Sequence, residues 1–150
     1  MLSSREVVRS RNAPTGDYAE WLVAKATRGF LAARSEKSWD VCTKSDHHPN
    51  GQCLKKGQHI QVKARVVSDK DAQPALSPFR SWTFDALVIV LFSATYEVLS
   101  AAKIPRTVVE GAPGTYWSKH VNGYVAYAKK DLILRGNPNY WTRRLQEAAV

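Results

Sequence analysis

The clearest pattern along the chain is an alternation of apolar and polar residues over His59–Val67. Its apolar positions are Ile60, Val62, Ala64 and Val66, and its polar positions are His59, Gln61, Lys63 and Arg65. Successive side chains of a strand point to opposite faces, so this segment is predicted to be a strand with one face in the core. The segment Phe84–Phe92 is instead almost continuously apolar, which is typical of a central strand covered on both faces.

Helical spacing appears near both ends of the sequence. Tyr18, Leu22, Ala26 and Phe30 recur at intervals of four after the Thr15–Asp17 cluster, which predicts a helix from about Asp17 to Ala33 that Gly29 weakens. Near the other end, Asn137 and Pro138 are suited to the N-cap and first position of a short amphipathic helix.

Shorter elements complete the pattern. Strands are predicted at Trp39–Cys42 and at Glu97–Ile104, the latter closed by Pro105. A helical turn is expected over Thr107–Glu110, and Asn122-Gly123 is a hairpin signal. Together these elements predict one α/β domain over residues 1–150, with residues 1–14 as a candidate flexible N-terminal segment.

The charge of the chain favours a polyanionic partner. There are 22 Lys and Arg against 13 Asp and Glu, a net charge of +9, and basic side chains that neutralise phosphates release condensed counterions. Nucleic acid is therefore the first hypothesis, although excess lysine also serves solubility alone. Residues 1–14 lack the pattern of a secretory signal, and the longest apolar run, Ala86–Phe92, is too short to span a membrane. We expect a cytoplasmic protein with no membrane contact, in which Cys42 and Cys53 are free thiols.

The polar positions predict a site for phosphodiester chemistry. If the Asp40 strand pairs with the Gln61 strand, then Asp40, Gln61 and Lys63 share one face, and Glu20 can approach from the helix. Hydrolysis of a phosphodiester needs a divalent metal held by oxygen ligands and a cation near the charge that develops in the transition state. Two carboxylates, an amide and a lysine supply these groups.

These residues, in this order, resemble the PD-(D/E)XK nuclease superfamily. The motifs are Gly16–Glu20 on a helix, Ser38–Asp40 at a strand, and Gln61–Lys63 after a hairpin. More narrowly, the sequence is similar to small uncharacterised bacterial members with Gln61–Arg65 and then Phe84-Asp85 opening a buried strand. The similarity covers about residues 16–105. It implies a restriction-endonuclease-like mixed central sheet flanked by helices, Mg²⁺ or Mn²⁺ as cofactor, and cleavage of DNA as in restriction-type nucleases and resolvases.

The resemblance also implies roles for the site residues. Asp40 would be the metal-binding aspartate, Gln61 the second ligand, Glu20 the auxiliary carboxylate and Lys63 the catalytic lysine. The sequence departs from the commonest motif, because Gln61 replaces an acidic ligand and Trp39 replaces Pro. A neutral second ligand leaves more of the metal charge to Glu20. Two hypotheses follow: an active endonuclease, expected as a homodimer when it cuts both strands, or a decayed scaffold that binds nucleic acid or protein.

Simpler roles remain open for the same residues. Glu20 is three residues after Asp17, as in a capping box, and Gln61 and Lys63 alone would suit a solvated strand face. The loop between Cys42 and Cys53 contains Asp46, His47 and His48, but its spacing fits no closed zinc motif.

Basic residues around the predicted site are candidates for DNA contact. They are Lys55, Lys56, Arg65, Lys70 and Arg80. The last third of the chain adds aromatic and basic residues that resemble a nucleic-acid surface, although core packing is expected for most of these rings.

Overall fold

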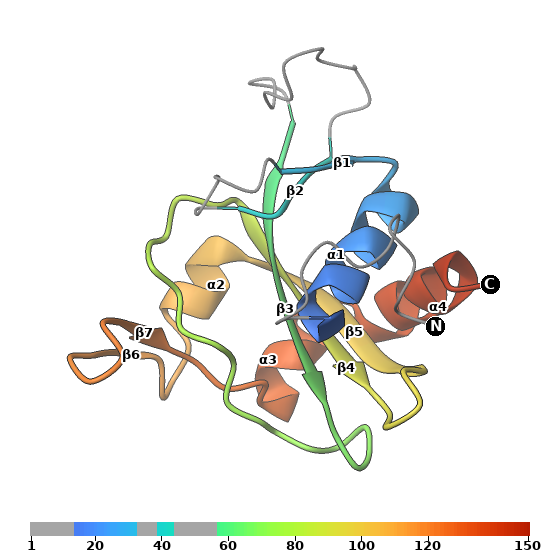
Figure 1. Ribbon diagram of the computed structural model, residues 1–150. Coiled ribbons are helices and arrows are strands. Elements are labelled where there is room, and N and C mark those ends of the chain that lie inside the picture. Colours follow the sequence, from blue (N-terminus) through green and yellow to red (C-terminus); the bar gives the residue numbers. More distant parts are fainter. Residues whose placement is uncertain (1–13, 33–38, 44–56) are drawn as a thin grey trace.

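A computed structural model describes residues 14–32, 39–43 and 57–150, and its centre is a five-stranded mixed sheet (Figure 1). The strands are β1 (Phe30–Leu31), β2 (Val41–Cys42), β3 (His59–Val66), β4 (Ala86–Phe92) and β5 (Val98–Pro105), hydrogen-bonded in that order. The β3–β4 pair is parallel and the other pairs are antiparallel. The predicted α/β class, with a mixed central sheet flanked by helices, is confirmed.

Two apolar cores lie on opposite faces of this sheet. On one face α1 (Pro14–Thr27) and α4 (Pro138–Ala148) pack over Ile60, Val62 and Val88. On the other face α2 (Arg106–Glu110) and α3 (Lys130–Leu134) pack over the side chains of β4 and β5 that point away from α1. All seven residues of β4 are buried, as predicted for a strand covered on both sides.

The first helix ends earlier than the predicted Ala33. Arg28 adopts a left-handed conformation with φ of 56°, the N–H of Gly29 donates to the carbonyl of Ala24, and that of Arg28 donates to Lys25. These bonds form a Schellman motif, which satisfies the terminal carbonyls and stops the helix. A Cβ at Gly29 would lie 2.2 Å from the carbonyl oxygen of Cys42, so only glycine lets the chain turn into β1.

The remaining predicted elements are largely present. The strands β3 and β5, the helical turn α2 and the C-terminal helix α4 follow the predicted ranges closely. The Asn-Gly signal marks a real hairpin, formed by β6 (Tyr116–Ser118) and β7 (Gly123–Val125). The sequence did not predict β1 or α3, because two residues and five residues are too short for a periodic pattern to emerge.

Two further expectations concern cysteine chemistry and membranes. Cys42 is buried and disulfide-bonded, so the prediction of a free thiol is wrong for this residue, and Cys53 lies outside the described residues. The disulfide also removes Cys42 as a zinc thiolate, while Asp46, His47 and His48 lie outside the described ranges. Within residues 14–32, 39–43 and 57–150, no helix is long and apolar enough to cross a membrane.

Candidate active site

Asp40 lies where the pairing of β2 with β3 stops. Its N–H donates to the carbonyl of Ile60 at 2.7 Å. Its carboxylate oxygen Oδ2 accepts the N–H of Val62 at 2.7 Å and the amide Nε2 of Gln61 at 2.8 Å. The carboxylate therefore takes the place of the next strand carbonyl and satisfies an edge N–H of β3. The pairing of β2 with β3, which the predicted site required, is present, and it brings Asp40 beside Gln61.

Lys63 is two residues further along β3 and is buried, with 8% of its surface exposed. Its ammonium donates to Ser77 Oγ at 2.9 Å and to the carbonyl of Pro78 at 3.1 Å, and it lies 4.7 Å from the centre of the Phe79 ring. Burial lowers the pKa of Lys63 to about 8, while the carboxylate of Asp40 opposes that shift. A solvated strand face is thus the wrong interpretation for Lys63.

Two charged groups from other elements act on the same ammonium. The carboxylate of Glu20, from α1, raises the pKa of Lys63, and the guanidinium of Arg80 lowers it. Asp17 and Glu20 lie within α1, which begins at Pro14, so the capping-box alternative for Glu20 does not hold. The Glu20 carboxylate instead lies over the preceding turn, where a Cβ at Gly16 would be 4.0 Å from its Oε2. Glu20, Asp40, Lys63 and Arg80 therefore share one electrostatic environment.

The segment that holds the lysine had no signal in the sequence. Ser77, Pro78 and Phe79 are 14 to 16 residues beyond Lys63, in a stretch without regular structure. Phe79 is 1% exposed and exchanges backbone hydrogen bonds with Tyr124 of β7. Contact between two such distant segments arises only when the chain folds, so a local pattern cannot reveal it.

The oxygen donors of this site suit a hard divalent cation. Asp40 and Glu20 offer carboxylates and Gln61 offers a carboxamide, the ligand types that Mg²⁺ and Mn²⁺ prefer. Among the described residues, no group of three or more His, Cys, Asp and Glu gathers as a metal cluster.

The residues predicted to contact DNA lie in different parts of the structure. Arg80 is exposed and donates from Nη1 to the carbonyl of Asn122 at 3.0 Å, so it joins the site to the β6–β7 turn. Arg65 is exposed near the end of β3. Lys55 and Lys56 lie outside the described residues.

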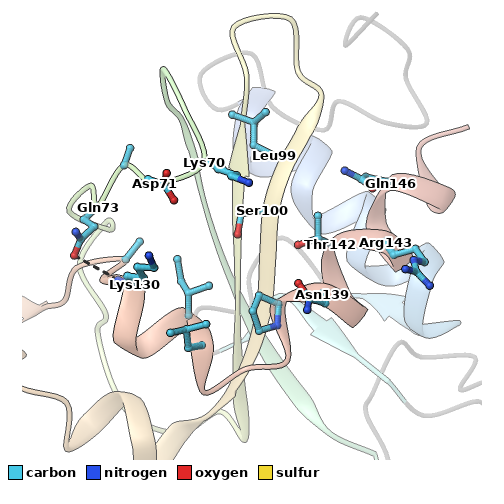
Figure 2. A pocket seen from close by; sticks show the side chains of 15 residues that line it. Lys70, Asp71, Gln73, Leu99, Ser100, Lys130, Asn139, Thr142, Arg143 and Gln146 are labelled. Carbon is cyan, nitrogen blue, oxygen red and sulfur yellow. Dashed lines mark hydrogen bonds between the residues drawn. The ribbon is translucent and has the colours of Figure 1, made fainter.

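Lys70 lies apart from these residues, in a groove of about 610 Å³. Figure 2 shows Lys70 and Lys130 on one side of the groove, Thr142 of α4 on the other, and Ser100 of β5 between them. None of Glu20, Asp40, Gln61 and Lys63 lines this groove. Lys70 therefore does not share the surroundings of Lys63.

Comparisons with known proteins give a likeness among solved structures but no family. No family model matches the chain, and no curated protein matches it. Among solved structures, the chain is similar to a bacterial homing endonuclease, I-Ssp6803I, with 17% identity and a TM-score of 0.46 over 93% of this chain and 94% of that one. A likeness at this level assigns neither a family nor an activity.

Proposed function

We propose that this protein is a metal-dependent endonuclease that hydrolyses phosphodiester bonds of DNA, of the restriction or resolvase type. The observation that carries the proposal is the environment of Lys63, a buried ammonium held by Ser77 and Pro78 in the field of Asp40 and Glu20. Buried titratable groups with charged partners are enriched at functional sites. The net charge of +9 agrees with a DNA substrate.

Three residues would hold the cation. Asp40, Glu20 and the amide oxygen of Gln61 are the ligands that this proposal assigns to Mg²⁺ or Mn²⁺. When bound there, the cation would polarise a phosphoryl oxygen and lower the pKa of an attacking water. The backbone N–H of Val62 and the side chain of Gln61 both donate to Asp40 Oδ2, which fixes the orientation of that carboxylate.

Lys63 would supply the positive charge for the transition state. An ammonium has three donors, and Ser77 Oγ and the Pro78 carbonyl accept two of them, which leaves one for a phosphoryl oxygen or the attacking water. The two fixed acceptors and the Phe79 ring orient the ammonium before the substrate arrives. At neutral pH the group is mainly protonated, because its pKa is about 8.

Cleavage and metal binding test this proposal directly. Plasmid and duplex oligonucleotides would be incubated with the full chain and Mg²⁺ or Mn²⁺, and metal binding would be titrated by calorimetry. Asp40→Asn should bind metal more weakly and cleave far more slowly than the parent, since it removes one carboxylate charge at nearly constant shape. Parent-like cleavage by both Asp40→Asn and Lys63→Met would show that the site is misassigned.

A second candidate function is a decayed nuclease scaffold that binds nucleic acid without cutting it. The contact between Gln61 Nε2 and Asp40 Oδ2 favours it, because a hydrogen bond stands where a second acidic ligand would otherwise repel Asp40 and attract a cation. This alternative predicts DNA binding without metal uptake and without cleavage. Sedimentation with and without DNA would also test the expected homodimer.

A further inference from the structure

The β6–β7 hairpin presents two large aromatic side chains to solvent. Tyr116 is 53% exposed and Trp117 is 50% exposed, and they are adjacent on β6. Figure 1 shows the hairpin on the side of the molecule away from α4. Most of the aromatic residues of the last third were expected in the core, and for Tyr116 and Trp117 this expectation is wrong. About half of each side chain is therefore left to solvent and is available to a partner.

A continuous series of rings joins the hairpin to Lys63. Trp117 packs on Tyr124 at 4.9 Å, Tyr124 on Trp82 at 4.9 Å, and Trp82 on Phe79 at 5.2 Å. The Lys63 ammonium lies over that Phe79 ring. Three rings therefore separate Trp117 from Lys63, a path of at most about 20 Å, which is about six base pairs of B-form DNA.

The backbone also fixes the hairpin against the segment that holds Lys63. Phe79 and Tyr124 exchange two backbone hydrogen bonds of 2.9 Å. A Cβ at Gly123 would lie 2.9 Å from the Cβ of Pro78, so the two segments approach as closely as glycine allows. Arg80 adds its hydrogen bond to the carbonyl of Asn122. A partner bound to the hairpin therefore keeps a fixed position relative to Lys63.

The surface formed by these two segments contains no carboxylate side chain. Residues 72–84 and 111–130 include no Asp or Glu, although the chain has 13 of them. The same segments carry Arg80, Lys119, His120, Lys129 and Lys130. Exposed aromatic rings among cations and without acidic residues are suited to a polyanion that also offers bases for contact.

We propose that the β6–β7 hairpin is a DNA-contacting element, in which Tyr116 and Trp117 contact bases while Arg80 and Lys119 contact phosphates flanking the scissile bond. This inference rests on the proposed function, because it takes the substrate of Lys63 to be DNA. A two-stranded ribbon has dimensions that a major groove admits. A second copy of the chain is a poorer occupant, because two surfaces of the same positive charge repel each other.

Binding measurements on matched aromatic variants test the proposal. Affinity for a labelled duplex would be measured by fluorescence anisotropy in metal-free buffer for Tyr116→Ala, Trp117→Ala and Tyr140→Ala. Tyr140 on α4 is the control, because it is also 50% exposed but lies on the other side of the molecule (Figure 1). Loss of one aromatic ring that is buried against base edges should weaken binding about 10-fold. Tyr140→Ala should change it less than about 2-fold.

Two further measurements separate the outcomes. Lys119→Ala should lower the slope of log affinity against log salt by about 1, the value for one phosphate contact. Thermal unfolding identifies a variant that fails to fold, and Trp117→Phe then replaces Trp117→Ala, because it keeps the contact with Tyr124. Parent-like DNA affinity in Tyr116→Ala and folded Trp117 variants would overturn the inference, and so would a change confined to self-association in sedimentation. Failure of cleavage by the parent would count against the proposed function alone, since these variants report binding.

Discussion

Two lysines of the sheet, Lys63 on β3 and Lys103 on β5, make similar contacts but differ in their charged neighbours, and Lys63 is buried whereas Lys103 is half-buried. Each ammonium lies over an aromatic ring, Phe79 for Lys63 and Trp141 for Lys103, and each hydrogen-bonds to neutral oxygen. Burial lowers the pKa of both lysines. For Lys103 burial is the whole cause, whereas Asp40, Arg80 and Glu20 also act on Lys63.

The difference between the two lysines lies in the charges around them, since only Lys63 has carboxylates among the causes of its pKa shift. Lys103 is accommodated by an amide and a ring, which is sufficient for a long side chain that covers apolar surface. Lys63 has the same kind of support and, in addition, two carboxylates from separate elements. The following predictions use Lys103 or a neighbouring residue as the matched control.

The largest expected effect is on cleavage. Lys63→Met should reduce the turnover number by a factor of about 10² to 10³, the scale for one electrostatic donor to the transition state. Lys103→Met removes an equally long and partly buried lysine, and its turnover should stay within about 2-fold of the parent. Single-turnover cleavage with Mg²⁺ would be measured for both variants. Equal losses of turnover would contradict a specific role of Lys63 in cleavage.

The second effect is on the pH dependence of stability. The pKa of Lys63 is about 8 in the folded chain and 10.5 ordinarily, so between these values the unfolded state holds a proton that the native state has lost. The unfolding free energy of the parent, relative to Lys63→Met, should therefore rise with pH in this window, by about 3 kcal/mol at about 1.4 kcal/mol per pH unit.

Urea unfolding in metal-free buffer at several pH values would measure this difference. Because tyrosines and other lysines titrate in both proteins, their contributions cancel in the comparison with Lys63→Met. If the difference in unfolding free energy between the parent and Lys63→Met stays constant from pH 8 to 10.5, the pKa of Lys63 is not lowered in the folded chain.

The third effect concerns the ring beneath Lys63. Phe79→Leu should destabilise the protein by about 2 kcal/mol, because it loses packing and the cation–π contact. Phe84→Leu is the control, since Phe84 is also 1% exposed and stacks on Phe79 at 5.7 Å. Chemical denaturation should show losses of similar size, but only Phe79→Leu should lower the pKa of Lys63 further. If Phe84→Leu lowers the pKa of Lys63 as well, the cause is a general loosening of the core and not the loss of the ring beneath the ammonium.

The smallest effect is expected from a single hydrogen bond. Ser77→Ala removes one acceptor of the Lys63 ammonium, which should lower the pKa of Lys63 and slow cleavage by a factor of about 5, close to 1 kcal/mol. Ser81→Ala, in the same segment, breaks a bond to Thr83 instead and should leave the rate unchanged. The pH profile of single-turnover rates distinguishes them. Identical profiles would show that Ser77 does not tune the lysine.

The sequence by itself determined the elements whose pattern is local. The alternation in β3 and the continuous apolar run of β4 predicted two neighbouring strands of different exposure, because side-chain direction in a strand has a period of two. The same alternation placed Gln61 and Lys63 on one face, whereas the β2–β3 pairing that brings Asp40 beside Gln61 was a condition of the predicted site that the structure fulfils. The end of α1 was predicted too late, since the Schellman motif used Arg28 rather than glycine in the left-handed position.

Only the tertiary structure decided what surrounds the predicted residues. The alternation of β3 would have suited a solvated Lys63, but Ser77, Pro78 and Phe79 cover it from a segment without regular structure. The exposure of Trp117 likewise depends on Tyr124, Trp82 and Phe79, which come together only when the hairpin docks on that segment. Burial and charge environment depend on contacts between residues far apart in the chain, and the free energy of those contacts has no local signature. The sequence therefore identified the candidate site residues, and the fold decided which of them are buried and which charges surround them.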